Sequence, residues 1–451
     1  MTDIAHRDET ARSTVRTRAM PGMAALDGAL RYVGPALLIL SCGAAAALGG
    51  AAYAPYGADT AFGVAVGAAG FVAMAEALIL AARPRFLEPL FGGLDRMYRA
   101  HKWLGVSALA LMILHDMREP DFDRIVRESR LGDMAGEAGE LVFNVLLALV
   151  AVSWFRRLPF VKLEIPYHLW RFSHRAMGAL FAVAAFHQFF VDMPKGVDPT
   201  LSIMLNLFAV AGLIAWVQTQ FLAPFLRRKA YTVREIVRQG EVTSLTLAPE
   251  GRAMRWRPGQ FVFLGAPEAG LSEPHPFTIA SAPRADGALT LSIRALGGWT
   301  RRLPLALRES MNVQIEGPYG RFDFRKGGAK QIWLAGGVGV TPFLAWAESL
   351  TAADQREIHL VYSVRSLQDA MGLEALEAAA ARNRRFSFEV VATQRDGRLA
   401  GDQLVTSTPF AVSEADLWFC GPSGLKDGLL KDLRALGQSP RRLRFEHFRF
   451  A

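Results

Sequence analysis

Four histidines with nearly repeated spacing are the residues of this chain best suited to hold a metal centre in an apolar environment. His101 and His115 lie 14 residues apart in one apolar segment, and His174 and His187 lie 13 residues apart in another. At about 1.5 Å of helical rise per residue, either step spans roughly 20 Å, which places one imidazole near each face of a bilayer. The spacing therefore predicts two haems stacked through a membrane, and electron transfer as their chemistry.

Each of these histidines has an alternative role as a hydrogen-bonded packing residue at membrane depth. A 14-residue step returns to within roughly 40° of the starting helix face, whereas a 13-residue step requires a bent helix or rotated haem planes. Imidazoles are costly in hydrocarbon, so unpaired structural roles for all four are not expected. We therefore favour ligation for the set and keep packing open for any single histidine.

Apolar segments in the first half of the chain must position these histidines. The 451 residues are 51% hydrophobic and the mean hydropathy is positive, which is unusual for a soluble enzyme. Six stretches approach the roughly 20 residues that a bilayer requires. They are 33–54, 60–82, 97–117, 140–158, 167–191 and 200–223. We expect a six-helix transmembrane bundle in residues 31–226, after a basic tail in residues 1–30. Glu76 lies in the second stretch, where it could assist proton movement or pair with Arg83.

Basic residues mark one side of this bundle. They crowd the tail, the connections between spans 2 and 3 and between spans 4 and 5, and the end of span 6. The positive-inside rule then predicts a bacterial-type inner membrane protein with both termini in the cytoplasm. This topology explains most of the net charge of +9, so no nucleic-acid partner is expected. We interpret the first apolar run as an uncleaved anchor, because it exceeds the usual length of a signal-peptide core.

The pattern of apolar and polar residues changes after Lys229. Short alternating runs divided by Gly, Pro and charged residues predict an antiparallel β-barrel domain over 227–328. From Gln331 onward a strand, a glycine loop, a helix and a second strand predict a parallel α/β nucleotide-binding domain over 329–451. The predicted fold is therefore a multi-domain membrane protein: a helical bundle followed by a β-barrel and an α/β domain.

The segment HPFTIAS at 275–281 follows the strand-like run RPGQFVF at 257–263. With these motifs the chain resembles the NADPH oxidase and ferric reductase superfamily, in which a transmembrane haem domain is fused to a ferredoxin-reductase-type flavoprotein. The resemblance covers roughly residues 31–451 and implies that the heptapeptide lies along FAD. Taken alone, the heptapeptide also describes a strand edge and a polar turn. The implied FAD contacts are His275, Pro276, Phe277, Thr278 and Ser281.

A second segment, IRALGGWT at 293–300, lies at the position of the family segment that binds the FAD diphosphate. Exposed backbone N–H groups and one fixed cation suit a pair of phosphates. The resemblance therefore implies FAD contacts from Arg294, Gly298 and Thr300. The alternative for Arg294 is an ordinary surface cation.

The glycine loop LAGGVGVTP at 334–342 follows a predicted strand and precedes a predicted helix. Its glycines would let the backbone approach a dinucleotide diphosphate at the helix N-terminus, although close strand–helix packing is an alternative reason for them. The expected nucleotide contacts are Gly336, Gly337, Gly339, Thr341 and Pro342. Ser363 and Arg365 end the next strand with groups that suit a ribose 2′-phosphate, which favours NADPH over NADH. Arg395 and Arg398 could add to that site or be loop charges.

The segment FCGPSG at 419–424 resembles the family segment that places a cysteine beside the nicotinamide ring. The resemblance implies that Cys420 positions the hydride donor, with Gly421 and Pro422 as nucleotide contacts; inert packing is the alternative for a lone cysteine. In the family a C-terminal aromatic residue stacks on the flavin. Phe448 is our first candidate for that residue and Phe450 the second, and a strand edge with one buried face is the alternative.

The resemblance also implies an order of electron transfer. It selects His174 rather than His168 as a ligand, and pairs His101 with His174 at one haem and His115 with His187 at the other. Electrons would pass from NADPH to FAD, then through two b-type haems to a small acceptor on the outer face. Bis-imidazole ligation favours outer-sphere transfer. We expect dioxygen as acceptor, forming superoxide. The alternatives are a ferric chelate, a periplasmic or membrane protein partner, and a haem-free flavoprotein with a structural anchor.

Overall fold

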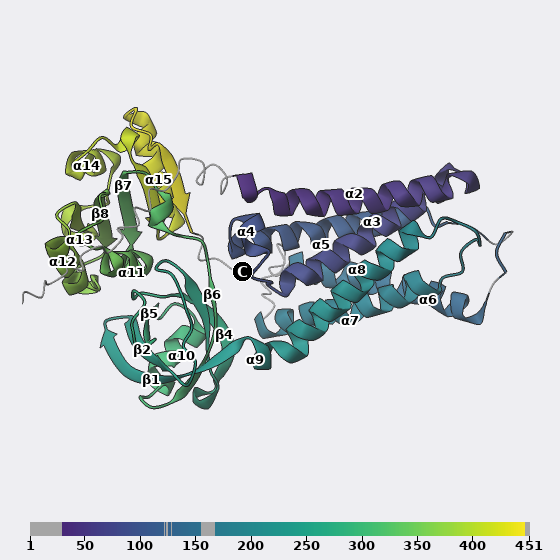
Figure 1. Cartoon of the computed structure of the whole chain (residues 1–451), viewed down its shortest axis with the longest axis horizontal. Helices are drawn as coiled ribbons and strands as arrows, with labels where there is room; N and C mark the ends of the chain where they lie inside the picture. Colours follow the sequence, from purple (N-terminus) through teal and green to yellow (C-terminus); the bar gives the residue numbers. More distant parts are fainter. Residues whose placement is uncertain (1–28, 121, 123–124, 128, 155–166, 447–451) are drawn as a thin grey trace, which may run out of the picture.

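The computed structural model describes residues 29–120, 122, 125–127, 129–154 and 167–446 (Figure 1). Its first half is a bundle of long helices and its second half contains two sheets, and the bundle extends away from the sheets in Figure 1. The bundle helices are α2 (Val33–Tyr53), α3 (Ala58–Ala81), α4 (Glu88–Phe91), α5 (Leu94–Asp116), α6 (Arg130–Trp154), α7 (Tyr167–Phe190), α8 (Thr200–Val217) and α9 (Ala223–Leu226).

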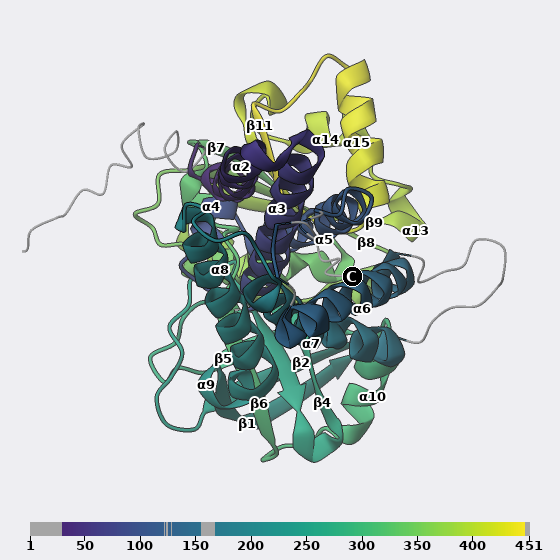
Figure 2. The same ribbon diagram turned by 90° about the vertical axis from the view of Figure 1, so that its right-hand side faces the viewer.

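Four helices in the described part of the chain are long and apolar enough to cross a membrane. They cover Val33–Tyr56, Ala58–Ala81, Arg130–Ser153 and Thr200–Leu222. Helices α5 and α7, which carry the four histidines, are 23 and 24 residues long. They are less apolar, because each also carries basic residues near its start. Figure 2 looks along the bundle and shows α3 surrounded by α2, α5 and α8, which pack against it.

The prediction that Glu76 pairs with Arg83 is wrong. The carboxylate of Glu76 instead accepts hydrogen bonds from the hydroxyl of Ser41 and the thiol of Cys42 on the neighbouring helix. Arg83 lies beyond the end of α3 and reaches Glu316 of the second half. The other alternative for Glu76, assistance in proton movement, stays a hypothesis.

The first sheet is antiparallel, as predicted, and its six strands follow the order β4-β3-β6-β1-β2-β5. An isolated bridge between Ile279 and Leu291 connects the chain after β4 to β5, the other edge of the sheet. Alternating buried and accessible residues in β2 fit a sheet with one face on a core. The elements are β1 (Arg228–Gln239), β2 (Val242–Pro249), β3 (Phe261–Ala266), β4 (Leu271–Thr278), β5 (Leu289–Arg294), α10 (Gly298–Ala306) and β6 (Asn312–Tyr319).

The second sheet is parallel, as predicted, with strand order β11-β10-β7-β8-β9. Strand β7 is buried along almost its whole length, which is typical of a parallel strand covered on both faces. The elements are β7 (Lys330–Gly336), α11 (Thr341–Ser349), β8 (Glu357–Val364), α12 (Leu373–Arg382), β9 (Phe386–Ala392), α13 (Thr393–Asp396), α14 (Gly401–Ser407), β10 (Asp416–Cys420), α15 (Ser423–Ala435) and β11 (Arg442–Phe445).

Candidate functional site

The structure brings His101 of α5 and His174 of α7 together at the end of the bundle that faces the sheets. Their ring centroids are 5.9 Å apart. His101 Nδ1 lies 2.9 Å from the carbonyl oxygen of Ala77 on α3. His174 Nδ1 lies 3.3 Å from the hydroxyl of Ser153 on α6, and the ring stacks on Trp170. We call His101 and His174 the inner pair.

His115 and His187 lie near the opposite ends of the same two helices, and we call them the outer pair. His115 Nδ1 is 2.9 Å from the carbonyl oxygen of Gly63 on α3. His187 Nδ1 is 2.7 Å from the carbonyl oxygen of Ala135 on α6. Both rings are therefore oriented by the backbone of a neighbouring helix.

Two glycines make room for the outer pair. A Cβ atom added to Gly67 of α3 would lie 2.7 Å from His115 Nδ1, and one added to Gly139 of α6 would lie 2.7 Å from His187 Nδ1. Contacts this short force a side chain or helix to shift. Neither glycine was predicted from the sequence, because each of the two flanking helices carries three glycines and nothing in the pattern singles out Gly67 or Gly139.

The bonds to backbone carbonyls decide which ring nitrogen can bind a metal. A carbonyl oxygen only accepts hydrogen bonds, so Nδ1 of His101, His115 and His187 must carry the proton, which leaves Nε2 as the free ligand atom. Two metal–imidazole bonds of about 2.0 Å on opposite sides of one ion put the ring centroids roughly 6 Å apart. The 5.9 Å separation of the inner pair matches that arrangement. These residues fit the haem that the resemblance implies.

The predicted flavin segment lies on β4 and just beyond it, packed against Trp299 of α10. The rings of His275 and Phe277 lie 4.6 and 5.6 Å from the Trp299 ring, centroid to centroid. Thr278 Oγ1, His275 Nε2 and Trp299 Nε1 are buried and have no hydrogen-bond partner among the described residues. Buried polar atoms are rarely left unpaired, so these atoms fit a ligand with hydrogen-bonding groups, such as FAD.

The other predicted flavin residues have protein partners. The hydroxyl of Ser281 is buried and accepts a hydrogen bond from the N–H of Thr290. Thr300 Oγ1 accepts hydrogen bonds from two backbone N–H groups at the start of α10, a helix that begins at Gly298. Pro276 lies within β4, opposite Phe263 of β3. Among the predicted flavin residues, Thr278 has a buried hydroxyl without a hydrogen-bond partner in the described part of the chain. His275 Nε2 lies 3.7 Å from the Glu273 carboxylate, beyond hydrogen-bond distance.

Arg294 connects the flavin segment to the glycine loop. It ends β5 and pairs with Glu241, 2.9 Å between Nη2 and the carboxylate. Its Nη1 lies 3.9 Å from the Cβ position of Gly337, whose φ of +55° favours glycine. The structure therefore brings the predicted diphosphate cation beside the predicted nucleotide loop.

The glycine loop itself packs against the segment that contains Cys420. A Cβ atom on Gly336 would lie 2.8 Å from Pro422 Cδ, and one on Gly339 would lie 2.3 Å from the Cys420 carbonyl oxygen. Close packing therefore accounts for these two glycines, which was the alternative to nucleotide binding. Gly421 also approaches Gly336, and the loop leads into α11 through Thr341 and Pro342. The predicted nucleotide residues thus lie together at the carboxyl ends of β7 and β10.

Cys420 is fully buried at the end of β10. Burial, with a smaller effect from the Glu446 carboxylate, raises the pKa of its thiol well above the usual range. The thiol therefore stays protonated at neutral pH, which suits a positioning role better than a nucleophilic one. Burial also raises the pKa of Glu446 to about 8, and Asp95 and Glu88 add to that shift. Glu446 was not among the residues predicted from the sequence.

Two further predicted residues lie at or just after the carboxyl end of β8, which is an interior strand of the parallel sheet. Ser363 is buried near the end of β8. Arg365 follows β8, is largely exposed, and lies 3.4 Å from the Asp369 carboxylate. Phe448 and Phe450 lie outside the described residues.

A cluster of contacts that the sequence did not reveal fixes the bundle against the first sheet. Arg83, after α3, pairs with the buried Glu316 of β6 at 3.1 Å, and its guanidinium lies over the ring of Phe263. The hydroxyl of Tyr319 donates to Glu316 at 2.7 Å. Phe263 and Tyr319 belong to the same hydrophobic core as residues of the bundle helices. The inner histidine pair is thus held at a fixed position relative to the flavin segment.

Three family models match successive parts of the chain. The ferric reductase like transmembrane component matches residues 66–185, an FAD-binding domain matches residues 227–323, and an oxidoreductase NAD-binding domain matches residues 333–429. The order of these matches is the order in which the bundle, the antiparallel sheet and the parallel sheet follow one another.

Curated relatives share parts of this arrangement. The toluate 1,2-dioxygenase electron transfer component of Pseudomonas putida is 28% identical over 222 residues, which are 47% of this chain and 65% of that protein. Ferric reduction oxidase 8, mitochondrial, of Arabidopsis thaliana is 30% identical over 138 residues, 27% of this chain and 19% of that protein. Respiratory burst oxidase homolog protein A of Solanum tuberosum is 27% identical over 247 residues, 47% of this chain and 25% of that protein.

The chain spans less than two thirds of the length of each of these relatives. The three matches together place a ferric-reductase-like transmembrane component, an FAD-binding domain and an oxidoreductase NAD-binding domain in one chain. This combination matches the NADPH oxidase and ferric reductase superfamily.

Proposed function

We propose that this protein carries electrons from cytosolic NADPH, through FAD and two b-type haems, to an acceptor on the outer face of the membrane, with dioxygen as the first candidate. In this proposal residues 31–226 form a six-span di-haem domain, and α5 and α7 span the bilayer with the four apolar helices. Both are long enough, at 23 and 24 residues. Residues 227–328 bind FAD, residues 329–451 bind NADPH, and both termini are cytoplasmic.

The geometry of the inner pair carries this proposal. Two imidazoles from different helices lie with their ring centroids 5.9 Å apart and their planes inclined by 78°, a separation that suits bis-histidine ligation. The bond from His101 Nδ1 to a carbonyl frees its Nε2 for iron. Because the outer pair lies on the same two helices and both of its Nδ1 atoms also meet backbone carbonyls, two haems provide the simplest common explanation for all four side chains.

The flavoprotein residues would perform the cytosolic half of the reaction. His275, Phe277 and Thr278 would hold FAD, which supplies the conversion of a two-electron donor to one-electron transfers. Arg294 and the loop from Gly336 would face diphosphates. Cys420 would orient the nicotinamide as a neutral thiol. Ser363 and Arg365 would favour NADPH through its 2′-phosphate, with NADH as the weaker substrate.

Haem content tests the proposal directly. The purified protein should contain two haems per chain by the pyridine haemochrome assay. It should also develop a reduced low-spin spectrum when NADPH is added without oxygen. Correctly folded protein that contains no haem would contradict the proposal, whereas haem that NADPH cannot reduce would contradict only the electron pathway.

A ferric chelate is the second candidate acceptor. Its support is the match to a relative named as a ferric reduction oxidase, whereas the match to a respiratory burst oxidase homolog supports dioxygen. The two are distinguished by reoxidation of the NADPH-reduced haems with oxygen or with ferric citrate at equal concentration. Faster oxidation by ferric citrate would reverse our order. Slow oxidation by both would favour a protein acceptor.

A further inference from the structure

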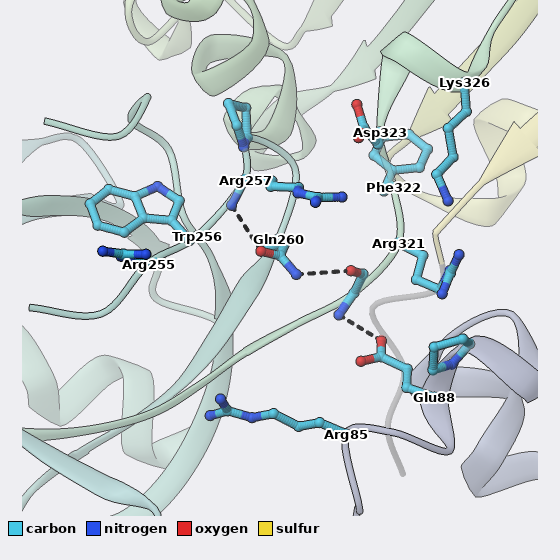
Figure 3. Close-up of a pocket in the computed structure, with 13 residues that line it drawn as sticks. Arg85, Glu88, Arg255, Trp256, Arg257, Gln260, Arg321, Phe322, Asp323 and Lys326 are labelled. Atoms are coloured by element: carbon cyan, nitrogen blue, oxygen red, sulfur yellow. Dashed lines mark hydrogen bonds between the residues drawn. The ribbon is translucent and has the colours of Figure 1, made fainter. Parts of the chain in front are cut away.

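Some contacts between the bundle and the flavoprotein involve only backbone atoms on the flavoprotein side. Figure 3 shows Glu88 and Arg85, which belong to the bundle, at this junction. Glu88 accepts a hydrogen bond of 2.8 Å from the N–H of Gly320, and Arg85 donates to the carbonyl oxygen of Gly317. These contacts join the two parts at a distance in sequence from the predicted flavin segment at 275–281.

Another contact across the junction involves side chains beside that segment. Arg171, three residues before His174 on α7, donates a hydrogen bond to Oε1 of Glu273 on β4. The other oxygen of this carboxylate, Oε2, lies 3.7 Å from Nε2 of His275. All three side chains are only about one third exposed. One carboxylate therefore lies between a cation of the bundle and a ring that we assign to FAD.

The Glu273 carboxylate bonds to Arg171 and not to His275. At 3.7 Å the His275 contact exceeds hydrogen-bond distance, and Nε2 is buried without a hydrogen-bond partner among the described residues. Burial lowers the pKa of His275, while the Glu273 carboxylate opposes this shift and the Arg171 guanidinium adds to it. Trp299 of α10 and Leu264 of β3, which also lie beside His275, are uncharged.

Arg171 therefore decides which partner the carboxylate takes. A guanidinium stays charged at every accessible pH, whereas an imidazole is a cation only when it is protonated. While Arg171 holds Glu273, His275 remains neutral and its Nε2 remains available. Without Arg171, a small movement of Glu273 would form an ion pair with protonated His275, and that pair would occupy Nε2.

We propose that Arg171, a residue of the membrane bundle, is a positioning residue for the flavin site: it holds Glu273 away from His275 and so keeps Nε2 free for FAD. This inference rests on the assignment of FAD to His275 in the proposed function. It implies that the helix that carries His174 also contributes, without touching the flavin, to flavin affinity.

Flavin affinity of the full-length protein tests this role. Protein in phosphatidylcholine nanodiscs, depleted of FAD by gel filtration, is titrated with FAD, and quenching of flavin fluorescence gives the Kd. Arg171→Gln should raise the Kd roughly tenfold at pH 7, because FAD must then break the new ion pair. Adding Glu273→Gln to this variant removes the competing carboxylate and should return the Kd to within about threefold of wild type.

The pH dependence separates this role from a loss of structure. In Arg171→Gln the paired Glu273 raises the pKa of His275, so the ion pair exists below that pKa and is lost as the pH rises through it. The ratio of the variant Kd to the wild-type Kd should therefore fall toward one between about pH 7 and 9, above the ordinary histidine pKa of about 6.5. A variant with a damaged site would stay defective over this range.

Arg85→Gln is the matched control, because it removes another arginine contact across the junction but none at His275. Its Kd for FAD should equal that of wild type. Thermal unfolding by circular dichroism checks each variant, and Arg171→Met replaces Arg171→Gln if the latter does not fold. His275→Ala should weaken FAD binding at least roughly tenfold.

The possible failures can be told apart. If wild type does not bind FAD, or if His275→Ala binds it as wild type does, the flavin site of the proposed function is wrong and the role of Arg171 is wrong with it. If binding requires His275 but Arg171→Gln binds FAD as wild type does, only the positioning role is overturned. Equal weakening by Arg85→Gln, or no recovery in the double variant, would also overturn that role alone.

Discussion

The inner and outer histidine pairs have matching positions on α5 and α7, yet they are held differently. In the outer pair, His115 and His187 both bond through Nδ1 to backbone carbonyls, of Gly63 and Ala135. Those carbonyls belong to helices whose positions are fixed by packing. No side-chain substitution removes such a partner, although a bulkier residue can displace the ring.

The inner pair depends on side chains at one of its two members. His101 uses the carbonyl of Ala77, but His174 meets the hydroxyl of Ser153 and stacks on Trp170. That hydroxyl donates to the carbonyl of Leu149, so its oxygen is placed to accept from Nδ1. Substituting a side chain can therefore alter the inner site, whereas the outer site is sensitive mainly to steric intrusion.

Replacing one histidine of each pair should give the largest change, because the two pairs occupy different positions in the electron pathway. His101→Leu should remove the inner haem and abolish NADPH-driven reduction of the outer haem, because electrons then have no entry point. His115→Leu should remove the outer haem and leave the inner haem reducible. Anaerobic stopped-flow absorbance after NADPH addition measures both. If NADPH reduced the remaining haem equally in the two variants, the proposed order of electron transfer would be wrong.

A substitution beside His187 tests whether the outer site is sensitive to steric intrusion, and we expect the second-largest change from it. Gly139→Ala places a Cβ atom 2.7 Å from His187, and overpacking of this kind costs about 1–3 kcal/mol. The ring must move away from the Ala135 carbonyl, so we expect haem content to fall from two to one per chain. Gly136→Ala is the matched control, because it lies on the same helix with nothing within 4 Å of the new Cβ. Two haems in both variants would contradict this account.

A third substitution tests electron transfer from the flavin to the inner pair, which lies at the end of the bundle that contacts the flavoprotein. Arg83→Ala leaves the buried Glu316 carboxylate without its ion pair, a change that costs about 3–5 kcal/mol. Flavin-to-haem transfer should slow at least tenfold, since about 1.4 kcal/mol changes a docked population tenfold. Flavin reduction by NADPH should persist.

Two further variants control this measurement. Adding Glu316→Gln to Arg83→Ala should recover part of the transfer rate, because it removes the unpaired charge. Arg234→Ala breaks an exposed ion pair with Asp286 inside the same sheet and should have little effect. If Arg234→Ala slowed transfer as much as Arg83→Ala does, the docking contact would not be the cause.

We expect the smallest change from a substitution of Ser153, the side chain that distinguishes the inner pair from the outer pair. Ser153→Ala removes the acceptor for His174 Nδ1, which makes the imidazole a weaker donor to oxidised iron. A hydrogen bond of about 1 kcal/mol corresponds to roughly 40 mV for one electron. A spectroelectrochemical titration should show one haem potential raised by about that amount and the other unchanged. A shift in both potentials would show that the pairs are not independent.

Much of the arrangement was predictable because it depends on local patterns. Helical spacing predicted that the four histidines lie near the two ends of a helix pair, and alternation predicted the antiparallel sheet. The strand–loop–helix order around Gly336 predicted the parallel sheet. Among the described residues, the two histidine-bearing helices are not among the four that are apolar enough to qualify as spans, because basic residues such as Arg99 and Arg171 lower their hydropathy.

The partners of these residues could not be predicted from the sequence. Every residue has a carbonyl, so nothing in the sequence marks Ala77 or Ala135 as the partner of a histidine. Arg83 and Glu316 are far apart in sequence and meet only because the sheet folds back onto the bundle. Charge allowed Glu76 to pair with Arg83 as one of two alternatives, but Glu76 lies beside Ser41 and Cys42 of α2.

The most direct test of the central claim, that electrons cross the membrane from the flavoprotein to the outer pair, uses sealed proteoliposomes with ferricyanide trapped inside. NADPH added outside reaches only molecules whose flavoprotein faces outward. We predict that wild-type protein reduces the trapped ferricyanide and that His115→Leu does not, although its inner haem is still reduced. Unchanged trapped ferricyanide with wild-type protein, despite rapid NADPH oxidation by external acceptors, would contradict the account.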